Sequence, residues 1–363
     1  MKVLHVVAAR PNFMKIAPIR AEMMRQSDQF QQVLVHTGQH YDANMSKVFL
    51  EDLDMPMPDE FLNVGSGTHA EQTARVMLAF EPVLLKYQPD WTIVVGDVNS
   101  TMACALVCAK LGRRVAHVEA GLRSNDRTMP EEINRIVTDH ICDRLYTPSP
   151  DGNENLRREG VPTSRICLVG NVMIDSLVQM LPRAQRSTVV KDLRLRPREY
   201  ILVTMHRSSN VDDAAVLREL LDTLVEIALQ TTVVFPVHPR TRKHIEAFGL
   251  QQAGVDIRFL DPKSYLDFLA LMDSASAVLT DSGGVQEETT WLGVPCLTVR
   301  PNTERPITIT QGTNRLVAGT RQAILEALDE VLHAGVSTAT PPRPDLWDGH
   351  TAQRIAEDLL AQG

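Results

Sequence analysis

Short runs of Val, Ile and Leu alternate along the chain with longer stretches in which apolar residues recur at helical spacing. This alternation is typical of a parallel sheet that carries helices on its faces. In the first half we expect strands at residues 2–9, 32–38, 92–97, 115–120, 144–149 and 166–171. A second series is expected at residues 200–206, 231–238, 257–260, 277–283 and 295–300. The pattern therefore predicts two Rossmann-like, doubly wound α/β domains.

The segment between the two series differs from both of them. Residues 172–198 contain a helical piece, two prolines and several charges, but no strand pattern. We therefore expect an N-terminal domain over 1–171, a junction over 172–198 and a C-terminal domain over 199–349. A second Pro-rich break precedes a helical tail at 350–363, which we expect to rejoin the N-terminal domain.

Charge and composition narrow the range of partners. The 363 residues include 37 Lys and Arg and 45 Asp and Glu, which gives a formal net charge of −8. An acidic chain without a basic block is a poor match for nucleic acid, whose phosphates need clustered cations. A small anion could still bind in a locally basic cleft.

The cysteines and the apolar runs bear on location. Five cysteines without a CxxC pair give no support for disulfides or a zinc ribbon, and fit a reducing compartment. The apolar run before Arg10 is too short for a signal peptide, and no uncharged apolar stretch is long enough to cross a bilayer. We expect a cytoplasmic protein with no membrane partner.

Polar residues gather where the predicted strands end. In open α/β sheets, ligands bind outside the carboxyl ends of the strands. We therefore predict a site in the cleft between the two domains. Any α/β protein places some polar residues at such positions, so the whole set carries more weight than any one member. The set comprises Arg10, Gly38 with Gln39 and His40, Asp97, Glu119, His206, His238, and Asp281 with Ser282.

The first strand leads into Arg10 and Lys15 around a Pro-Asn turn that opens a helix. Both cations lie near the positive end of that helix, which favours a phosphate. For Lys15 the alternative is a solvent-exposed helix face. The Walker pattern is absent and the one glycine-spaced segment, at 65–71, does not follow a strand. Nicotinamide and flavin binding are therefore disfavoured, and we expect no cofactor.

The run TDSGGVQEE at 280–288 resembles the string around a serine-protease nucleophile, but it follows a strand of an α/β unit. Ser282, Gly283 and Gly284 are better interpreted as a diphosphate cradle, because a strand that turns through two glycines into a helix presents backbone N–H groups. Glu287 or Glu288 could accept hydrogen bonds from ribose hydroxyls. The alternative for these glutamates is an interaction with the helix dipole.

Carboxylates and histidines complete the candidate chemistry. Asp97 and Glu119 end predicted strands, and Glu131 or Glu132 opens a helix after a proline. Carboxylates in one cleft raise one another's pKa, which suits acid and base catalysis. They could instead ligate Mg²⁺, but a metal is not required.

His206 and His238 each close a strand of the second series. No HExxH or facial-triad spacing joins them, so contact with a diphosphate or leaving group is preferred to metal ligation. Purely structural histidines are the alternative.

Eight motifs carry a resemblance to a known family. RPNFMKIAP, VVGDVNST, HVEAGLRS, MPEEINR, VTMHR, PVHPR, DSGGVQEE and TERP occur in the order and spacing of the non-hydrolysing UDP-N-acetylglucosamine 2-epimerases. They extend from Arg10 to Pro306, so the resemblance covers nearly the whole chain.

The resemblance implies a GT-B-like fold, a homodimer and the interconversion of UDP-GlcNAc and UDP-ManNAc without a redox cofactor. It implies elimination of UDP to a 2-acetamidoglucal followed by re-addition, with a product that feeds the synthesis of ManNAc-containing surface polysaccharides. Matching motif by motif gives the acid and base roles to Asp97, Glu119 and Glu131, and contact with the sugar or ordering of Glu131 to Arg135. The residues that would hold UDP are His206, also counted as catalytic, with Arg10, Lys15, Ser282 and Gly283 at the diphosphate and Glu288 at the ribose.

Gln39 and His40 match a segment that, in many bacterial members, helps to form a second, activating UDP-GlcNAc site. Tyr41 stands here in place of the basic residue that follows, so a regulatory role of this segment is left open. Three alternatives remain for the activity. They are a 2-epimerase of another UDP-2-acetamido sugar such as a 2,3-diacetamido uronic acid, a hydrolysing epimerase, and a GT-B glycosyltransferase, which would not need carboxylates on both faces of the sugar.

Overall fold

The computed structural model describes residues 1–38, 50, 53–251, 257–333 and 343–363. The chain forms two compact units, and each is described by itself. Unit 1 comprises Met1–Ser176 and Asp345–Gly363, and unit 2 comprises Leu177–Pro344. The dividing point lies within helix α7 (Val172–Ala184), inside the segment where a junction was expected.

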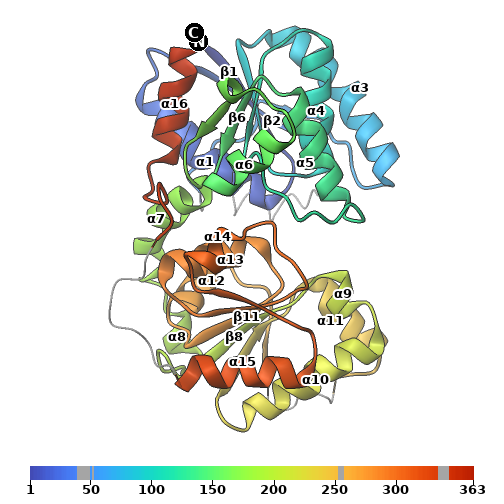
Figure 1. Cartoon of the computed structure of the whole chain (residues 1–363), viewed down its shortest axis with the longest axis vertical. Coiled ribbons are helices and arrows are strands. Elements are labelled where there is room, and N and C mark those ends of the chain that lie inside the picture. Colours follow the sequence, from blue (N-terminus) through green and yellow to red (C-terminus); the bar gives the residue numbers. More distant parts are fainter. Residues whose placement is uncertain (39–49, 51–52, 252–256, 334–342) are drawn as a thin grey trace. The chain divides into compact units, whose positions relative to one another are not determined.

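Unit 1 is built on a seven-stranded sheet with the order β3-β2-β1-β4-β5-β6-β7, in which every pairing is parallel. Its strands are β1 (Lys2–Val7), β2 (Gln31–His36), β3 (Glu60–Phe61), β4 (Trp91–Val95), β5 (Val115–Val118), β6 (Arg144–Thr147) and β7 (Ile166–Leu168). Its remaining elements are α1 (Arg10–Arg25), α3 (His69–Tyr87), α4 (Asn99–Lys110), α5 (Pro130–Ile141), α6 (Pro150–Arg158), the 3₁₀ turn η1 (Thr163–Arg165) and α16 (Thr351–Ala361). Helices α1 and α16 cover one face of the sheet, and α3, α4 and α5 cover the other (Figure 1).

Unit 2 holds a six-stranded parallel sheet with the order β10-β9-β8-β11-β12-β13. Its strands are β8 (Tyr200–Thr204), β9 (Thr232–Pro236), β10 (Arg258–Leu260), β11 (Ala277–Thr280), β12 (Cys296–Val299) and β13 (Asn314–Val317). Its helices are α8 (Val189–Asp192), α9 (Ser208–Val211), α10 (Ala214–Ala228), α11 (Pro239–Ala247), α12 (Tyr265–Asp273), α13 (Gly283–Leu292), α14 (Ile307–Thr310) and α15 (Arg321–His333). Helices α10 and α15 pack together on one face of this sheet, and α12 and α13 pack together on the other (Figure 1).

Local sequence signals explain where several helices begin. Thr68 and Glu71 form a capping box at α3, in which each side chain accepts a hydrogen bond from the other residue's backbone N–H. Asp213 caps α10 by accepting from the N–H groups of Ala215 and Val216. Between the strands and helices, a fully buried apolar core fills each unit, with Leu4 and Phe80 in unit 1 and Val203 and Phe235 in unit 2.

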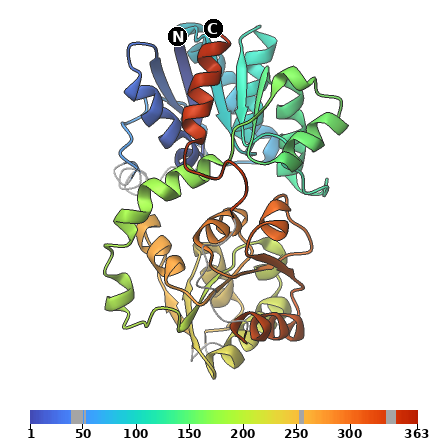
Figure 2. The same ribbon diagram turned by 60° about the vertical axis from the view of Figure 1, so that its left-hand side comes forward.

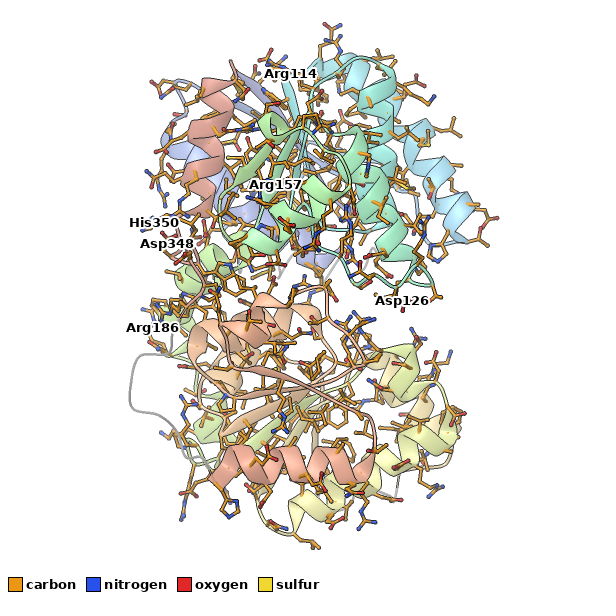
Figure 3. The ribbon with its side chains drawn as sticks, viewed as in Figure 1. Arg114, Asp126, Arg157, Arg186, Asp348 and His350 are labelled. Carbon is orange, nitrogen blue, oxygen red and sulfur yellow. The ribbon has the colours of Figure 1, made fainter. Side chains whose placement is uncertain are left out.

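The C-terminal helix belongs to unit 1, and the two chain ends lie side by side (Figure 2). Asp175 caps α16 by accepting from the N–H groups of Thr351 and Ala352, at 3.1 and 2.7 Å. At the other end of the helix, Arg114, labelled in Figure 3, donates to the carbonyl of Gln362 at 2.9 Å. Unit 1 is therefore assembled from both ends of the chain.

Candidate active site

The strand order of each sheet locates the polar residues. In both sheets the order of the strands reverses next to the first strand. This switch point lies between β1 and β4 in unit 1 and between β8 and β11 in unit 2. At such a switch point the loops diverge to opposite faces and leave a crevice for ligands. In unit 1, Arg10 and Asp97 follow β1 and β4, and in unit 2, His206 and Ser282 follow β8 and β11. Each unit thus carries its candidate residues at its own switch point.

Lys15 and Glu119 form an ion pair in unit 1, from the first turns of α1 and the end of β5. Both side chains are less than one-tenth exposed. Lys15 therefore lies on the covered face of its helix, and the solvent-exposed alternative is wrong. Glu119 has a φ of +74°, a left-handed conformation that is uncommon for residues other than glycine. Arg10, the first residue of α1, is exposed.

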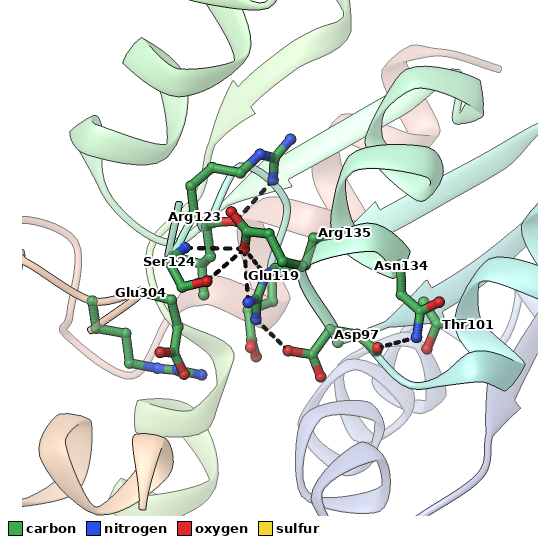
Figure 4. A network of polar contacts seen from close by, with 12 residues as sticks. Asp97, Thr101, Glu119, Arg123, Ser124, Asn134, Arg135 and Glu304 are labelled. Atoms are coloured by element: carbon green, nitrogen blue, oxygen red, sulfur yellow. Dashed lines mark hydrogen bonds and ion pairs between the residues drawn. The ribbon is translucent and has the colours of Figure 1, made fainter. Parts of the chain in front are cut away.

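A second cation, Arg135 on α5, joins two further carboxylates (Figure 4). Its Nη1 lies 2.5 Å from Oδ2 of Asp97, and its Nε and Nη2 donate to Oε2 of Glu132 at 3.1 and 2.8 Å. The Asp97 side chain is 28% exposed whereas that of Arg135 is 3% exposed, so the aspartate is the accessible end of this chain of contacts. The buried guanidinium of Arg135 therefore fixes the position of the Asp97 carboxylate.

The structure separates the two neighbouring glutamates of α5. Glu132 is buried, and besides Arg135 it accepts hydrogen bonds from the backbone of Ser124 and Asn125. Burial acts to raise the pKa of Glu132, but these donors outweigh it, so the pKa is lowered overall. Glu131 is exposed in the first turn and has no hydrogen-bond or ion-pair partner among the described residues. Arg135 pairs with Asp97 and Glu132, and no contact joins it to Glu131 among the described residues, so the expected ordering of Glu131 is not seen. The expected contact of Arg135 with the sugar stays a prediction.

In unit 2, His206 is held by a buried aspartate. Its Nδ1 lies 2.9 Å from Oδ1 of Asp281, which also accepts from the backbone N–H of His206 and Arg207 and from the side chain of Asn210. Burial acts to raise the pKa of Asp281, but the hydrogen bond and charge of His206 outweigh it and lower the pKa overall. The ionised carboxylate thus fixes the ring of His206.

His238 lies beside this pair, with its ring centroid 5.4 Å from that of His206. As the N-cap of α11, its Nδ1 accepts from the backbone N–H of Arg240 at 3.2 Å. Partial burial, followed by the neighbouring His206, lowers the pKa of His238. A neutral ring that accepts at Nδ1 leaves Nε2–H as a donor to a ligand.

Ser282 is the N-cap of α13, and no side-chain capping bond satisfies the first N–H groups of this helix. A Cβ atom added to Gly283 would lie 2.7 Å from Nη1 of Arg305 and 2.9 Å from Oε1 of Glu304, whereas one added to Gly284 would meet nothing within 4 Å. The absence of a side chain at Gly283 therefore makes room for Arg305, whose guanidinium pairs with Glu287 and Glu304 at 2.8 and 2.5 Å. The uncapped N–H groups at the start of this helix suit an anion.

The two glutamates on α13 have different partners. Glu287 pairs with Arg305, while Glu288 accepts a hydrogen bond from the hydroxyl of Tyr265 at 2.7 Å. Burial raises the pKa of Glu288 to about 7. Glu288 thus accepts from a hydroxyl group in this structure, which is the kind of contact that a ribose would make.

Sequence reasoning did not single out three residues that order the site. Asp281 was noted only as a strand end, and Glu132 only as an alternative to Glu131. Arg305 lay inside the TERP motif without a role. The signal available for Glu132 was its spacing of three residues from Arg135 on a helix, which allows the pair. The pairs of Asp281 with His206 and of Arg305 with Glu287 join residues far apart in sequence.

Gln39 and His40, predicted for a regulatory site, lie outside the described residues. In the described part of the chain, no group of three or more His, Cys, Asp or Glu side chains is arranged to hold a metal ion. Among the same residues, no helix combines the length and apolar character needed to cross a membrane.

Comparison with known proteins places these residues in a family context. The family model described as UDP-N-acetylglucosamine 2-epimerase matches residues 22–360. A UDP-N-acetylglucosamine 2-epimerase from Methanocaldococcus jannaschii is 40% identical over 99% of both chains. A UDP-2,3-diacetamido-2,3-dideoxy-D-glucuronate 2-epimerase from Pseudomonas aeruginosa is 42% identical, again over 99% of both.

Solved structures agree with the expected fold class. The crystal structure of the M. jannaschii UDP-GlcNAc 2-epimerase in complex with UDP-GlcNAc and UDP matches 100% of both chains, with a TM-score of 0.90 and 40% identity. A UDP-glucosyltransferase from Polygonum tinctorium matches 98% of both chains with a TM-score of 0.60 at 14% identity, a likeness of fold alone. The prediction of a GT-B-like pair of parallel α/β domains is confirmed.

Proposed function

Because this chain belongs to the UDP-N-acetylglucosamine 2-epimerase family and is an isomerase, we propose that it interconverts UDP-GlcNAc and UDP-ManNAc by eliminating and re-adding UDP. The observation that carries the proposal is that the carboxylates of Asp97 and Glu119 are both held in place by ion pairs. They follow the adjacent strands β4 and β5, and each is paired with a buried cation, Arg135 or Lys15. Two fixed carboxylates at the carboxyl ends of neighbouring strands suit a reaction that moves a proton.

The chemistry explains why a departing nucleotide is needed. The hydrogen on sugar C2 has no neighbouring carbonyl, so direct deprotonation of the resting substrate is implausible. When the C1–O bond breaks, UDP takes the electron pair and C1 acquires oxocarbenium character, which acidifies C2–H. A base then removes that proton, the C–H electrons form the C1=C2 bond of a 2-acetamidoglucal, and the reverse steps deliver a proton to the opposite face.

We assign the proton transfers to unit 1. Asp97, Glu119 and Glu131 are the proposed acid and base groups, of which Glu131 is exposed and Asp97 is 28% exposed. As UDP departs, Lys15 would release the carboxylate of Glu119 and pair with the diphosphate. Arg10 would also pair with the diphosphate. Because Glu132 is buried with several hydrogen-bond donors, we give it no proton-transfer role.

We assign UDP binding to unit 2. His206, fixed by Asp281, and His238 would donate to the diphosphate, as would the hydroxyl of Ser282 and the backbone N–H groups of Gly283 and Gly284. Glu288 would bind the ribose. Stabilisation of departing UDP should be the largest catalytic term, since one preorganised donor of this kind is worth about 3 kcal/mol in the barrier.

A second candidate substrate follows from the comparisons. The relative from P. aeruginosa that acts on a UDP-2,3-diacetamido-2,3-dideoxy-D-glucuronate is about as similar to this chain as the M. jannaschii enzyme. The two reactions share the acetamido group at C2, so the same carboxylates would serve both. We favour UDP-GlcNAc, with a product destined for ManNAc-containing polysaccharides, and keep the uronate as the alternative.

One experiment tests both candidates. The protein is incubated in D₂O with each UDP-sugar separately, and the sugar is followed by proton NMR. We expect deuterium at C2 and a mixture of UDP-GlcNAc and UDP-ManNAc. Exchange with the uronate alone would favour the second candidate, release of free ManNAc would indicate a hydrolysing epimerase, and loss of substrate only with an added acceptor would indicate a transferase.

A further inference from the structure

Two fully buried side chains lie behind the proposed catalytic carboxylates. His117 on β5 and Asp139 on α5 are both 0% exposed, and Nδ1 of His117 lies 2.7 Å from Oδ1 of Asp139. Neither of them takes part in the proposed proton transfers. Burying such a pair is costly unless every polar atom finds a partner, so its other contacts are informative.

The histidine reaches the residue before Asp97. Its Nε2 lies 2.8 Å from the carbonyl oxygen of Gly96. A carbonyl can only accept, so Nε2 donates. Gly96 has a φ of +69°, which is the left-handed region that favours glycine, and the chain turns there from β4 into Asp97. His117 therefore fixes the turn that positions the backbone of Asp97.

The aspartate reaches the segment after Glu119. Its Oδ2 accepts from the backbone N–H of Gly121 at 3.0 Å and from Nη1 of Arg123 at 2.7 Å. Burial acts to raise the pKa of Asp139, but His117 and Arg123 outweigh it and lower the pKa, so the group accepts as a carboxylate.

That segment has a demanding backbone. Glu119 and Gly121 have φ angles of +74° and +81°. A Cβ atom added to Gly121 would lie 2.4 Å from the carbonyl oxygen of Gly152, so the close approach requires glycine. A left-handed conformation at a non-glycine residue persists only where its surroundings enforce it. The hydrogen bond from Gly121 to Asp139 is one such constraint.

We propose that His117 and Asp139 are positioning residues that set the spacing between Asp97 and Glu119. One end of the pair fixes Gly96, directly before Asp97, and the other fixes Gly121, two residues after Glu119. The inference rests on the proposed function, in which these carboxylates transfer protons. A displacement of about 1 Å in a catalytic group can lower the rate about 10²-fold, which makes a buried device of this kind worth keeping.

A matched pair of variants tests the proposal. In His117→Asn the side-chain amide takes the place of Nδ1 and keeps the bond to Asp139, while in His117→Gln it takes the place of Nε2 and keeps the bond to Gly96. Both replace the same buried ring with an amide, so a general loss of packing affects both. His140→Asn, at an exposed position next to Asp139, is the control.

We expect His117→Asn to lower kcat about 10²-fold with little change in KM, and His117→Gln to retain more of the activity. With substrate deuterated at C2, the isotope effect on kcat should be larger in His117→Asn than in the wild type, because a misplaced base slows the C–H step. A smaller folded fraction would lower kcat without changing the isotope effect. UDP affinity, measured by calorimetry, should not change.

Three results would overturn the inference. The first is a His117→Asn variant with wild-type kcat and isotope effect, and the second is a loss of kcat that matches the loss of folded protein. If neither His117 variant folds, Asp139→Asn takes their place, since its amide can bond the same groups and should cost about tenfold or less in kcat. Loss of all activity in that well-folded variant is the third. A wild-type protein without C2 exchange on either UDP-sugar would instead overturn the proposed function.

Discussion

The buried carboxylate of Asp281 lies 2.9 Å from Nδ1 of His206 and accepts from the backbone of the same residue. Ring and backbone are thus fixed by one group, and Nε2 remains the nitrogen that can face a ligand. A histidine whose orientation is set in this way can donate to a departing diphosphate without first paying the entropy of finding its rotamer.

We therefore expect Asp281→Asn to lower kcat substantially, by up to the roughly 10²- to 10³-fold that one preorganised hydrogen-bond donor contributes. The C2 exchange assay in D₂O measures the effect, and calorimetry with UDP shows whether binding persists. Asp212→Asn is the control, because Asp212 is a more exposed carboxylate of unit 2 that pairs with Arg240. Full activity in Asp281→Asn would show that catalysis does not depend on the orientation of His206 by Asp281.

The fold was largely predictable because strands buried on both faces leave long apolar runs. All eleven expected strands are present, and the two missed strands, β3 and β13, both lie at sheet edges. β3 is only two residues long, and β13 includes the exposed Arg315, so neither has an apolar run to detect. Most expected strands also ended too late, since their last polar residues already belong to the loops.

The residues of the site were predictable, but most of their partners were not. A polar residue after an apolar run marks a strand end, which is how Asp97, Glu119 and His206 stood out. The pairs that hold them join distant positions, such as Lys15 with Glu119 and Asp281 with His206. Such pairs depend on strand order in the sheet, and that order is set by packing of the whole unit.

Glu119→Gln tests the ion pair with Lys15. We expect retained UDP binding and a loss of epimerisation of about 10²- to 10⁴-fold, because glutamine cannot take up a proton. Stability should also fall, since the variant leaves Lys15 buried without a counter-charge. The double variant Lys15→Met with Glu119→Gln removes both charges and should recover melting temperature but not activity. Full activity in Glu119→Gln would exclude Glu119 as an acid or base.

The two glycines at the start of α13 should respond differently to alanine. Arg305 is held by Glu287 and Glu304, so it cannot readily yield to a Cβ atom at Gly283. We expect Gly283→Ala to destabilise the protein by about 1–3 kcal/mol, as overpacking does. Gly284→Ala has open space and lies within a helix, so it should stabilise by about 0.5–1 kcal/mol.

Thermal melting compares these variants, and UDP titration then tests the cradle. A stable Gly284→Ala protein that binds UDP much more weakly would support a close approach of the diphosphate to this backbone. Equal melting temperatures for the two variants would contradict the packing argument at Gly283.

The buried Glu288 should make stability depend on pH in an unusual direction. Its pKa is raised to about 7 in the folded protein, because burial disfavours the charge, whereas in the unfolded chain the pKa is near the ordinary glutamate value of 4.5. Between these values the folded state binds more protons, so the contribution of Glu288 to stability falls as pH rises from about 4.5 to about 7. Glu288→Gln should equal the wild type near pH 4 and exceed it at pH 8 by up to about 3 kcal/mol. Chemical denaturation at several pH values, with the exposed Glu246→Gln as control, measures this difference; a gap that does not change with pH would show that Glu288 is ionised throughout.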